Sequence, residues 1–495
     1  PWVSLFHAFV FYGFVLYLLV NLFDLLKGYL SPAALARLDF GLLGGAYRFT
    51  VDILSVLILV GVVYLVVRRF LTRDPRLDQR NPETLVHERV REGSIRRDSI
   101  IVAVFIFLHV GFRLTGETFL LAAESHWDAF QPFASSLAAL VGYGEGRIVG
   151  WHVGWWGALG LILAFLPYFP RSKHIHLFMA PVNFALERRD EQGRPLPLGV
   201  LEPVDFEDES AEQFGAAKLE HLRWPQLLDA YACIQCNRCT NVCPANVTGK
   251  TLSPAALEIN KRYELNVVAG ALATGEESPR PLTDFAISTE SLWACTACGA
   301  CMEICPVGCT QMIDIIEIRR DQVMMQGEFP AELQTAFRGM ERSGNPWGLG
   351  QDKRLDWAEG LDVPTLDQDS TEERPDFDVL FWVGCAGSYD PTAQQTTRAM
   401  ARILDHAGVD YAVLGQGEKC TGDPARRAGN EYLYYQLASE NVATLNAVLL
   451  EDEHLAGTLD RAKRKRVVTT CPHCFNALFN DYPQLGGEYD VLHHS

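Results

Sequence analysis

The sequence predicts a multi-domain protein that joins an α-helical transmembrane bundle to an α-helical cysteine-motif domain and an α/β domain. Three observations predict this architecture. Four long apolar runs precede residue 182, all 13 cysteines follow residue 232, and strand-like and helix-like segments alternate after residue 376. The 495 residues suffice for roughly three domains of about 100–200 residues. With 48% hydrophobic and 21% charged residues, the composition excludes a disordered or fibrous chain.

The net charge of −18 is distributed unevenly along the chain. Residues 1–182 carry 16 Lys/Arg against 13 Asp/Glu, whereas residues 183–495 carry 27 against 48, which gives +3 and −21. Because so acidic a region repels a phosphate backbone, we expect no nucleic-acid partner. The cysteines fall mostly in short C-x-x-C runs, which favours metal ligation in a reducing compartment over a disulfide framework.

Each of the four apolar runs is long enough to cross a hydrocarbon core of about 30 Å as a helix. A cleavable signal peptide is the alternative for the first run, but three more runs follow and no small-residue cleavage site is present. The chain opens without a methionine at the edge of an apolar run, so we expect an upstream segment. The predicted spans of the domain at residues 1–182 are Trp2–Leu26, Thr50–Val67, Ile100–Leu121 and Val149–Phe169.

The distribution of arginine predicts how these spans are oriented. The connection at residues 68–97 holds nine arginines, whereas residues 27–49 and 122–148 hold three and one basic residues. Positively charged loops stay on the cytoplasmic side. We therefore predict a multi-pass protein of the inner (plasma) membrane, with all cysteines on the cytoplasmic side.

Histidines in the apolar region are candidate haem ligands, because intramembrane histidine is costly and imidazole is a common axial ligand of haem iron. On a continuous helix, His174 shares a face with His152, 22 residues earlier, whereas His176 points elsewhere. We therefore predict that His7 and His174 bind haem b near the cytoplasmic surface; histidines that only snorkel are the alternative. A second haem b would use His152, but the residue ten positions after His7 is Tyr17.

A polar strip occurs in the third predicted span. His109 could ligate with His152, or could stand beside Arg113 and Glu117, one and two turns further along the helix. Such a strip suits a quinone, whose carbonyls need a donor and whose reduction needs protons. An intramembrane ion pair that stabilises helix packing is the equal alternative.

The membrane region resembles a known family at several of these residues. Leu5-Phe6-His7, His152 and the segment from Pro167 to His174 are similar to the haem b subunit of respiratory nitrate reductase, over most of residues 1–180. In that family, two histidines ten apart on one helix serve two haems. Tyr17 departs from this pattern, so the resemblance implies one haem and leaves the second open.

After an acidic linker at residues 183–215, the region 216–345 contains two complete C-x2-C-x2-C-x3-C-P runs. In this arrangement three thiolates of each run hold one [4Fe–4S] cluster, and the fourth crosses to the other. Structural zinc is the alternative, but it requires neither the third C-x2-C step nor the proline. The predicted ligand sets are Cys233, Cys236, Cys239 and Cys305 for one cluster, and Cys295, Cys298, Cys301 and Cys243 for the other.

The rest of this region fits the same interpretation. The insert between the two runs has the apolar pattern of helices at residues 252–263, which predicts an α-helical ferredoxin domain. Cys309 is surplus to the motif and is predicted to be a buried thiol. Two clusters side by side conduct electrons rather than catalyse a reaction, so their purpose depends on what lies at either end.

After a linker at residues 346–375, the region 376–495 reads as an α/β domain. Short strands are predicted at 378–383, 411–414 and 466–470, and helices at 392–407 and 426–450. Four cysteines follow strand ends, where parallel sheets assemble their sites. We predict that a third iron–sulfur cluster binds there; zinc, or a redox dithiol at the last two cysteines, is the alternative. The ligands would be Cys385, Cys420, Cys471 and Cys474.

This cysteine spacing, together with the two ferredoxin motifs and Gly344-Asn345-Pro346-Trp347, resembles the catalytic subunit of heterodisulfide reductase over nearly all of residues 210–495. Iron–sulfur subunits of glycolate, lactate and glycerol-3-phosphate oxidoreductases are similar too. The family has paired cysteines where this chain has Cys420 and Thr421, so the resemblance implies an ordinary four-thiolate cluster. Members carry two cysteine-rich copies, so the region 376–495 is expected to be a truncated first copy.

Together the two resemblances imply a membrane-bound respiratory oxidoreductase. Electrons would pass between a cytoplasmic partner and membrane menaquinone through iron–sulfur clusters and haem b. Fusions of this layout are associated with electron-transfer flavoprotein, which is the expected partner. Two alternatives stay open: a quinone-linked thiol:disulfide reductase, and a non-catalytic electron-wiring subunit beside a lactate or glycolate flavoprotein.

Overall fold

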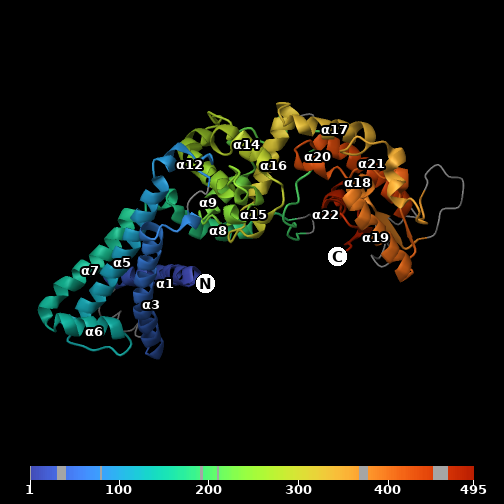
Figure 1. Cartoon of the computed structure of the whole chain (residues 1–495). Helices are drawn as coiled ribbons and strands as arrows, with labels where there is room; N and C mark the ends of the chain where they lie inside the picture. Colours follow the sequence, from blue (N-terminus) through green and yellow to red (C-terminus); the bar gives the residue numbers. More distant parts are fainter. Residues whose placement is uncertain are drawn as a thin grey trace. The chain divides into compact units, whose positions relative to one another are not determined.

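The computed structural model describes residues 2–29, 41–77, 81–189, 193–208, 211–366, 377–449 and 466–495. The chain forms two compact units (Figure 1). The first comprises Pro1–Pro82, Val86–Pro181 and Tyr231–Asn237. The second comprises Glu83–Leu85, Val182–Ala230 and Arg238–Ser495, and it holds both the α/β region and most of the ferredoxin region.

In the described residues, four helices of the first unit are long and apolar enough to cross a membrane. The second and third begin earlier than predicted, because polar residues such as Arg48 and Arg96 continue each helix beyond its apolar run. The four helices are α1 (Trp2–Tyr29), α3 (Leu42–Val66) with the π-helical turn η1 (Val67–Leu71), α5 (Ser94–Ala123) and α7 (Ile148–Phe165).

Glycines allow these helices to pack closely. A Cβ on Gly154 of α7 would lie 2.4 Å from the Cα of Gly116 on α5, and a Cβ on Gly13 of α1 would lie 2.4 Å from Ile58 on α3. Small residues commonly occupy such contacts, because packing rather than water exclusion holds membrane helices together. The pairs α5–α7 and α1–α3 therefore form the frame of the first unit (Figure 1).

A short helix that the sequence did not predict, α6 (Pro132–Val141), follows α5. Its first amides need acceptors, which an apolar setting does not supply. The carboxylate of Asp52 on α3 accepts hydrogen bonds from the backbone N–H groups of Phe133 (2.8 Å) and Ala134 (3.1 Å). This cap accounts for a buried carboxylate in an otherwise apolar helix.

The ferredoxin region is helical, as its sequence pattern indicates. Its longest helix, α12, covers most of the predicted helical segment at 252–263, and the Ser253 side chain caps it by accepting from the N–H of Ala256 (3.2 Å). The α-helices from Arg238 to Ser343 are α10 (Arg238–Val242), α11 (Pro244–Val247), α12 (Pro254–Ala273), α13 (Leu282–Phe285), α14 (Thr289–Ala294), α15 (Ala300–Glu303), α16 (Gln311–Arg320) and α17 (Ala331–Ser343).

The cysteine-rich region contains a four-stranded parallel sheet in the order β2-β1-β3-β4. Val379 pairs with Tyr411 on one side and with Arg466 on the other, which fixes the register. Because all strands are parallel, their carboxyl ends meet at one edge. The strands are β1 (Val379–Trp382), β2 (Tyr411–Ala412), β3 (Arg466–Thr469) and β4 (Asp490–His493), and the first three lie inside the predicted segments.

Helices cover both faces of this sheet. Trp382 of β1 lies in one core with Leu437 of α21 (Glu431–Leu449). Phe381, the preceding residue, lies in the other core with Leu404 of α19 (Pro391–Ala407). Since neighbouring residues of a strand point to opposite faces, the region has helix, sheet and helix layers.

Candidate functional site

A cavity of about 260 Å³ lies within the first unit. Its wall is mainly apolar, with side chains such as Phe14, Ile58 and Phe165. Four histidines also line it: His7 of α1, His109 of α5, and His174 and His176 from the segment after α7. An apolar wall suits a porphyrin and the imidazoles suit its iron, so the residues present fit a haem.

His152 and His174 do not lie on one continuous helix, so the predicted separation of His174 from His176 is wrong. Helix α7 ends at Phe165, and short 3-10 turns follow at η4 (Phe169–Arg171) and η5 (Lys173–Ile175) before α8 (His176–Ala185) begins. Pro167 and Pro170 lack the N–H groups that a continuous helix would use. His152 and His174 therefore do not share one helix, and both His174 and His176 reach the cavity.

Neither of the two residues considered for a second haem, His152 and Tyr17, is placed to bind one in the cavity. His152 is exposed on α7 and is not among the residues that line the cavity; its ring lies 4.5 Å from that of Trp151. Tyr17 does line the cavity, but its hydroxyl forms a 2.6 Å hydrogen bond with Ser55 of α3.

The predicted strip of His109, Arg113 and Glu117 is divided between two environments. His109 faces the large cavity, and its Nδ1 lies 3.0 Å from the carbonyl oxygen of Ala158. Arg113 and Glu117 face a separate cavity of about 20 Å³, which has room for water but not for a quinone ring.

Arg113 has a partner that the sequence did not reveal. Its Nε donates to Asp24 Oδ2 of α1 (3.0 Å), and its Nη2 lies 3.6 Å from Glu117 Oε1. Trp155 Nε1 also donates to the carbonyl oxygen of Asp24 (3.2 Å). A carboxylate inside the first apolar run was the available signal for Asp24. This geometry favours the ion-pair alternative for Arg113 and Glu117.

The two ferredoxin motifs fold into matching loops. Gln235 and Asn237 of the first motif have positive φ (56° and 58°), and so do Ala297 and Gly299 at the equivalent positions of the second (52° and 73°). In each loop the third residue donates its N–H to the first cysteine: Gln235 to Cys233 Sγ and Ala297 to Cys295 Sγ, both at 3.4 Å. Such bonds stabilise thiolates and tune a bound cluster.

Thiols of one predicted cluster gather in the second unit. Burial, together with the nearby thiols of Cys295, Cys243 and Cys298, raises the pKa of Cys301 to about 12. The crossing Cys243 is thus close to the other three members of its predicted set. The members of the other set divide between the units: Cys233 and Cys236 lie in the first, and Cys239 and Cys305 in the second.

Cys309, outside both ligand sets, is buried as predicted. Its Sγ donates to the carbonyl oxygen of Asp229 (3.5 Å), while its N–H donates to Cys305 Sγ (3.3 Å). A hydrogen bond from Cys309 lowers the pKa of the Cys305 thiol to about 6. Cys309 therefore supports a predicted ligand.

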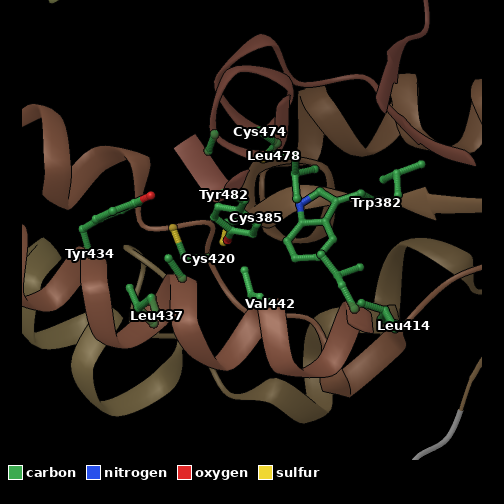
Figure 2. Close-up of a cluster of buried hydrophobic side chains, with 14 of the residues drawn as sticks. Trp382, Cys385, Leu414, Cys420, Tyr434, Leu437, Val442, Cys474, Leu478 and Tyr482 are labelled. Carbon is green, nitrogen blue, oxygen red and sulfur yellow. The ribbon is translucent and has the colours of Figure 1, made fainter. Parts of the chain in front are cut away.

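The four cysteines of the α/β region gather at the carboxyl edge of the sheet. Cys385 follows β1, Cys420 follows β2, and Cys471 caps α22 (Pro472–Asn476), which contains Cys474. A hydrogen bond with Cys471, burial, and the charges of Cys471, Cys385 and Cys420 all raise the pKa of Cys474. Figure 2 shows Cys385, Cys420 and Cys474 among Tyr434, Tyr482 and Trp382.

A glycine permits this approach of the thiols. Gly384 has φ +74°, and a Cβ there would lie 3.0 Å from Cys474 Sγ. Among the described residues, no group of three or more His, Cys, Asp or Glu side chains has the geometry of a single metal ion.

Two family profiles match the chain at these sites. The 4Fe-4S dicluster domain matches residues 232–310, and the cysteine-rich domain matches residues 379–479. No solved structure matches the chain. The two matched segments contain every cysteine predicted here as a cluster ligand.

Curated relatives resemble nearly the whole chain. The "Probable iron-sulfur-binding oxidoreductase FadF" of Bacillus subtilis is 34% identical over 99% of this chain and 69% of its own length. The "EtfAB:quinone oxidoreductase" of Syntrophomonas wolfei is 30% identical over 100% and 68%. One subunit of the dihydromethanophenazine:CoB–CoM heterodisulfide reductase of Methanosarcina barkeri is 29% identical over 54% and 62%. With its matches to a 4Fe-4S dicluster domain and a cysteine-rich domain, and its four apolar helices, the chain belongs to the family of iron–sulfur oxidoreductases that includes FadF and the EtfAB:quinone oxidoreductase.

Proposed function

We propose that this oxidoreductase passes electrons between a cytoplasmic electron-transfer flavoprotein and membrane menaquinone. The observation that carries the proposal is the histidine-lined cavity among helices long and apolar enough to cross a membrane, in the same chain as a 4Fe-4S dicluster domain and a cysteine-rich domain. Cysteine clusters alone would suit a soluble electron carrier. A haem in the membrane unit gives electrons a route into the lipid.

His7 and His174 would hold the proposed haem b, with His176 as the neighbouring alternative to His174. When bound, haem iron accepts and releases one electron at a time. The exposed position of His152 and the Tyr17–Ser55 hydrogen bond support one haem rather than two. The wall of the cavity is mainly apolar, which would limit the access of water to a bound haem.

Three iron–sulfur clusters complete the proposed path. The ferredoxin motifs would hold two [4Fe–4S] clusters in the predicted sets, and Cys385, Cys420, Cys471 and Cys474 would hold the third. Each cluster carries one electron, so the two electrons of a reduced flavin must leave it one after the other. Reduction of one quinone to its quinol consumes both electrons and two protons.

Of the predicted strip, His109 remains the candidate that would contact a quinone, whereas Arg113 and Glu117, paired with each other and with Asp24, would act only on its proton supply. His109 would be the donor to a quinone carbonyl oxygen, with the quinone outside the volume that the proposed haem would fill. Arg113 and Glu117, with Asp24, would serve proton supply, because their small cavity has the size of a water site. The nine arginines at residues 68–97 support placing that connection on the cytoplasmic side of the membrane. The iron–sulfur domains would then lie on the same side.

The thiol:disulfide reductase alternative has one supporting observation, the similarity to a heterodisulfide reductase of Methanosarcina barkeri. Thr421, a buried residue, replaces the second cysteine of the pair in the family pattern. Reduction of a disulfide by quinol, measured on the purified chain, would favour this alternative.

The decisive experiment counts haem in the full chain purified in detergent. We expect one haem b per chain, lost in His7→Ala and His174→Ala and kept in His176→Ala. His152→Ala is the matched control, because it removes an exposed histidine from the same unit. Intact iron–sulfur spectra would show that each variant is folded.

Two results would contradict the proposal. One is wild-type protein without porphyrin; the other is full haem content in both His7→Ala and His174→Ala. The partner is tested separately: reduced electron-transfer flavoprotein should reduce the haem within the mixing experiment, and an unchanged haem spectrum would exclude that donor.

A further inference from the structure

A buried ion pair lies beside Cys385 in the α/β region. Arg354 of η8 (Gln351–Ala358) and Glu418 each have about 1% of their surface exposed. The Arg354 Nη2 donates to Glu418 Oε1 at 2.6 Å. The two guanidinium nitrogens Nη1 and Nη2 also lie 3.9 and 3.8 Å from Cys385 Sγ. The guanidinium therefore contacts a carboxylate and a proposed cluster ligand at once.

Glu418 fixes the backbone that leads into Cys385. Its Oε2 accepts from the N–H of Val383 (3.0 Å) and its Oε1 accepts from the N–H of Gly384 (2.7 Å). These are the last two residues before Cys385. One carboxylate thus holds both the loop and the arginine in place.

Stability alone does not explain this arrangement. A buried ion pair commonly stabilises a protein no more than well-packed apolar residues of the same size would. Arg354 Nε is moreover buried without an acceptor among the described residues, which adds a desolvation cost. The guanidinium of Arg354 is buried despite this desolvation cost and contacts the sulfur of Cys385. This combination indicates an electrostatic role.

We infer that Arg354 raises the reduction potential of the cluster bound by Cys385, Cys420, Cys471 and Cys474, and that Glu418 positions it. This inference rests on the proposed third cluster. Reduction adds one negative charge to a cluster, and a fixed positive charge with N–H groups directed at a ligand sulfur stabilises the reduced form. Glu418 is thus the positioning residue, because it acts through Arg354 and through the backbone before Cys385.

The test is a redox titration of the full purified chain, followed by paramagnetic resonance. Arg354→Met keeps the length of the side chain and removes its charge. We expect reduction of the third cluster to become at least tenfold less favourable, a fall of about 59 mV for a one-electron couple. Arg354→Lys keeps the charge and should recover part of the shift.

Two controls make the shift specific. Lys353→Met removes the same charge from the neighbouring, exposed position and should leave all potentials unchanged. The ferredoxin clusters in the same molecule are internal references. Arg354→Met with Glu418→Gln guards against misfolding caused by an unpaired buried carboxylate. It should retain only part of the fall in potential, because the negative charge of Glu418, which opposes that of Arg354 at Cys385, is removed too.

The outcomes separate this inference from the proposed function. An unchanged third-cluster potential in Arg354→Met overturns the inference. Loss of the third cluster in all three Arg354 variants also overturns it, because Arg354 would then only maintain the fold. Wild-type protein with signals from the ferredoxin clusters alone would instead contradict the third cluster itself.

Discussion

The ferredoxin loops and the cysteine-rich region gather thiols by different routes. In the second ferredoxin motif, Cys295, Cys298 and Cys301 lie within seven consecutive residues, and the loop itself supplies an N–H for Cys295. In the cysteine-rich region, Cys385 and Cys474 are 89 positions apart and meet only because the parallel sheet brings strand ends together. The first site therefore forms within one loop, whereas the second forms only when the parallel sheet is folded.

The electrostatics of the two regions differ in the same way. Backbone N–H groups approach Cys233 and Cys295 from within their own motifs. Cys385 instead contacts Arg354, 31 positions away, which in turn pairs with Glu418. Substitutions that disturb the sheet or the segments after its strands should therefore affect the cysteine-rich site and leave the ferredoxin loops intact.

Gly384→Val should have the largest effect. The new side chain would meet Cys474 Sγ, 3.0 Å from the Cβ position, and valine is strained at φ +74°. We expect loss of the third cluster with both ferredoxin clusters retained, measured by iron content and paramagnetic resonance. Gly408→Val is the control, since Gly408 also has positive φ (+64°) but no atom within 4 Å. Equal loss in both variants would show that strain, and not the contact with Cys474, is responsible.

Cys301→Ala should remove one ferredoxin cluster and spare the others. Cys301 is buried against Cys295, Cys243 and Cys298, so its loss leaves three thiolates. Cys309→Ala is the matched variant, a buried cysteine outside the ligand sets. It should keep all clusters and cost about 1–2 kcal/mol of stability through a small cavity. Loss of a cluster in Cys309→Ala would indicate that the Cys309 thiol is itself a cluster ligand.

Several features could be predicted because their signals are local in sequence. The C-x-x-C spacing identifies the ferredoxin loops, and apolar runs locate the membrane helices to within several residues. Strand and helix patterns likewise anticipated β1, β2 and β3. Each of these signals lies within one short segment of the chain.

Features that depend on pairing across the fold were missed. Asp24 and Arg113 are 89 positions apart, and Arg354 and Glu418 are 64 apart, so neither pair leaves a pattern in sequence. The assumption of one helix from His152 to His174 failed because Pro167 and Pro170 end the hydrogen-bond ladder. Helix α6 was missed because its amides are capped from another helix, by Asp52.

Asp229 gives the ferredoxin region a pH dependence of intermediate size. Burial raises the pKa of this carboxyl to about 6, against about 3.9 when unfolded. The folded state therefore binds the proton more tightly, so stability is greatest at low pH and declines as the pH rises through 6. Between pH 5 and 7 we expect a loss of about 1 kcal/mol, measured by thermal unfolding. Asp229→Asn should flatten this slope; an unchanged slope would assign it to other groups.

The smallest effect should come from making the two ferredoxin loops alike. Gly299 has φ +73° where the first loop has Asn237 at +58°, and asparagine tolerates this region better than other residues with a Cβ. A Cβ on Gly299 would approach only Met302 Cε, at 3.9 Å. We therefore expect Gly299→Asn to keep both clusters and to change stability by less than about 1 kcal/mol. Gly299→Val should cost more, because a β-branched residue is disfavoured at positive φ. Equal thermal stabilities of Gly299→Asn and Gly299→Val would mean that the positive φ of residue 299 does not limit the stability of this loop. The similar conformations of the two loops would then need another cause.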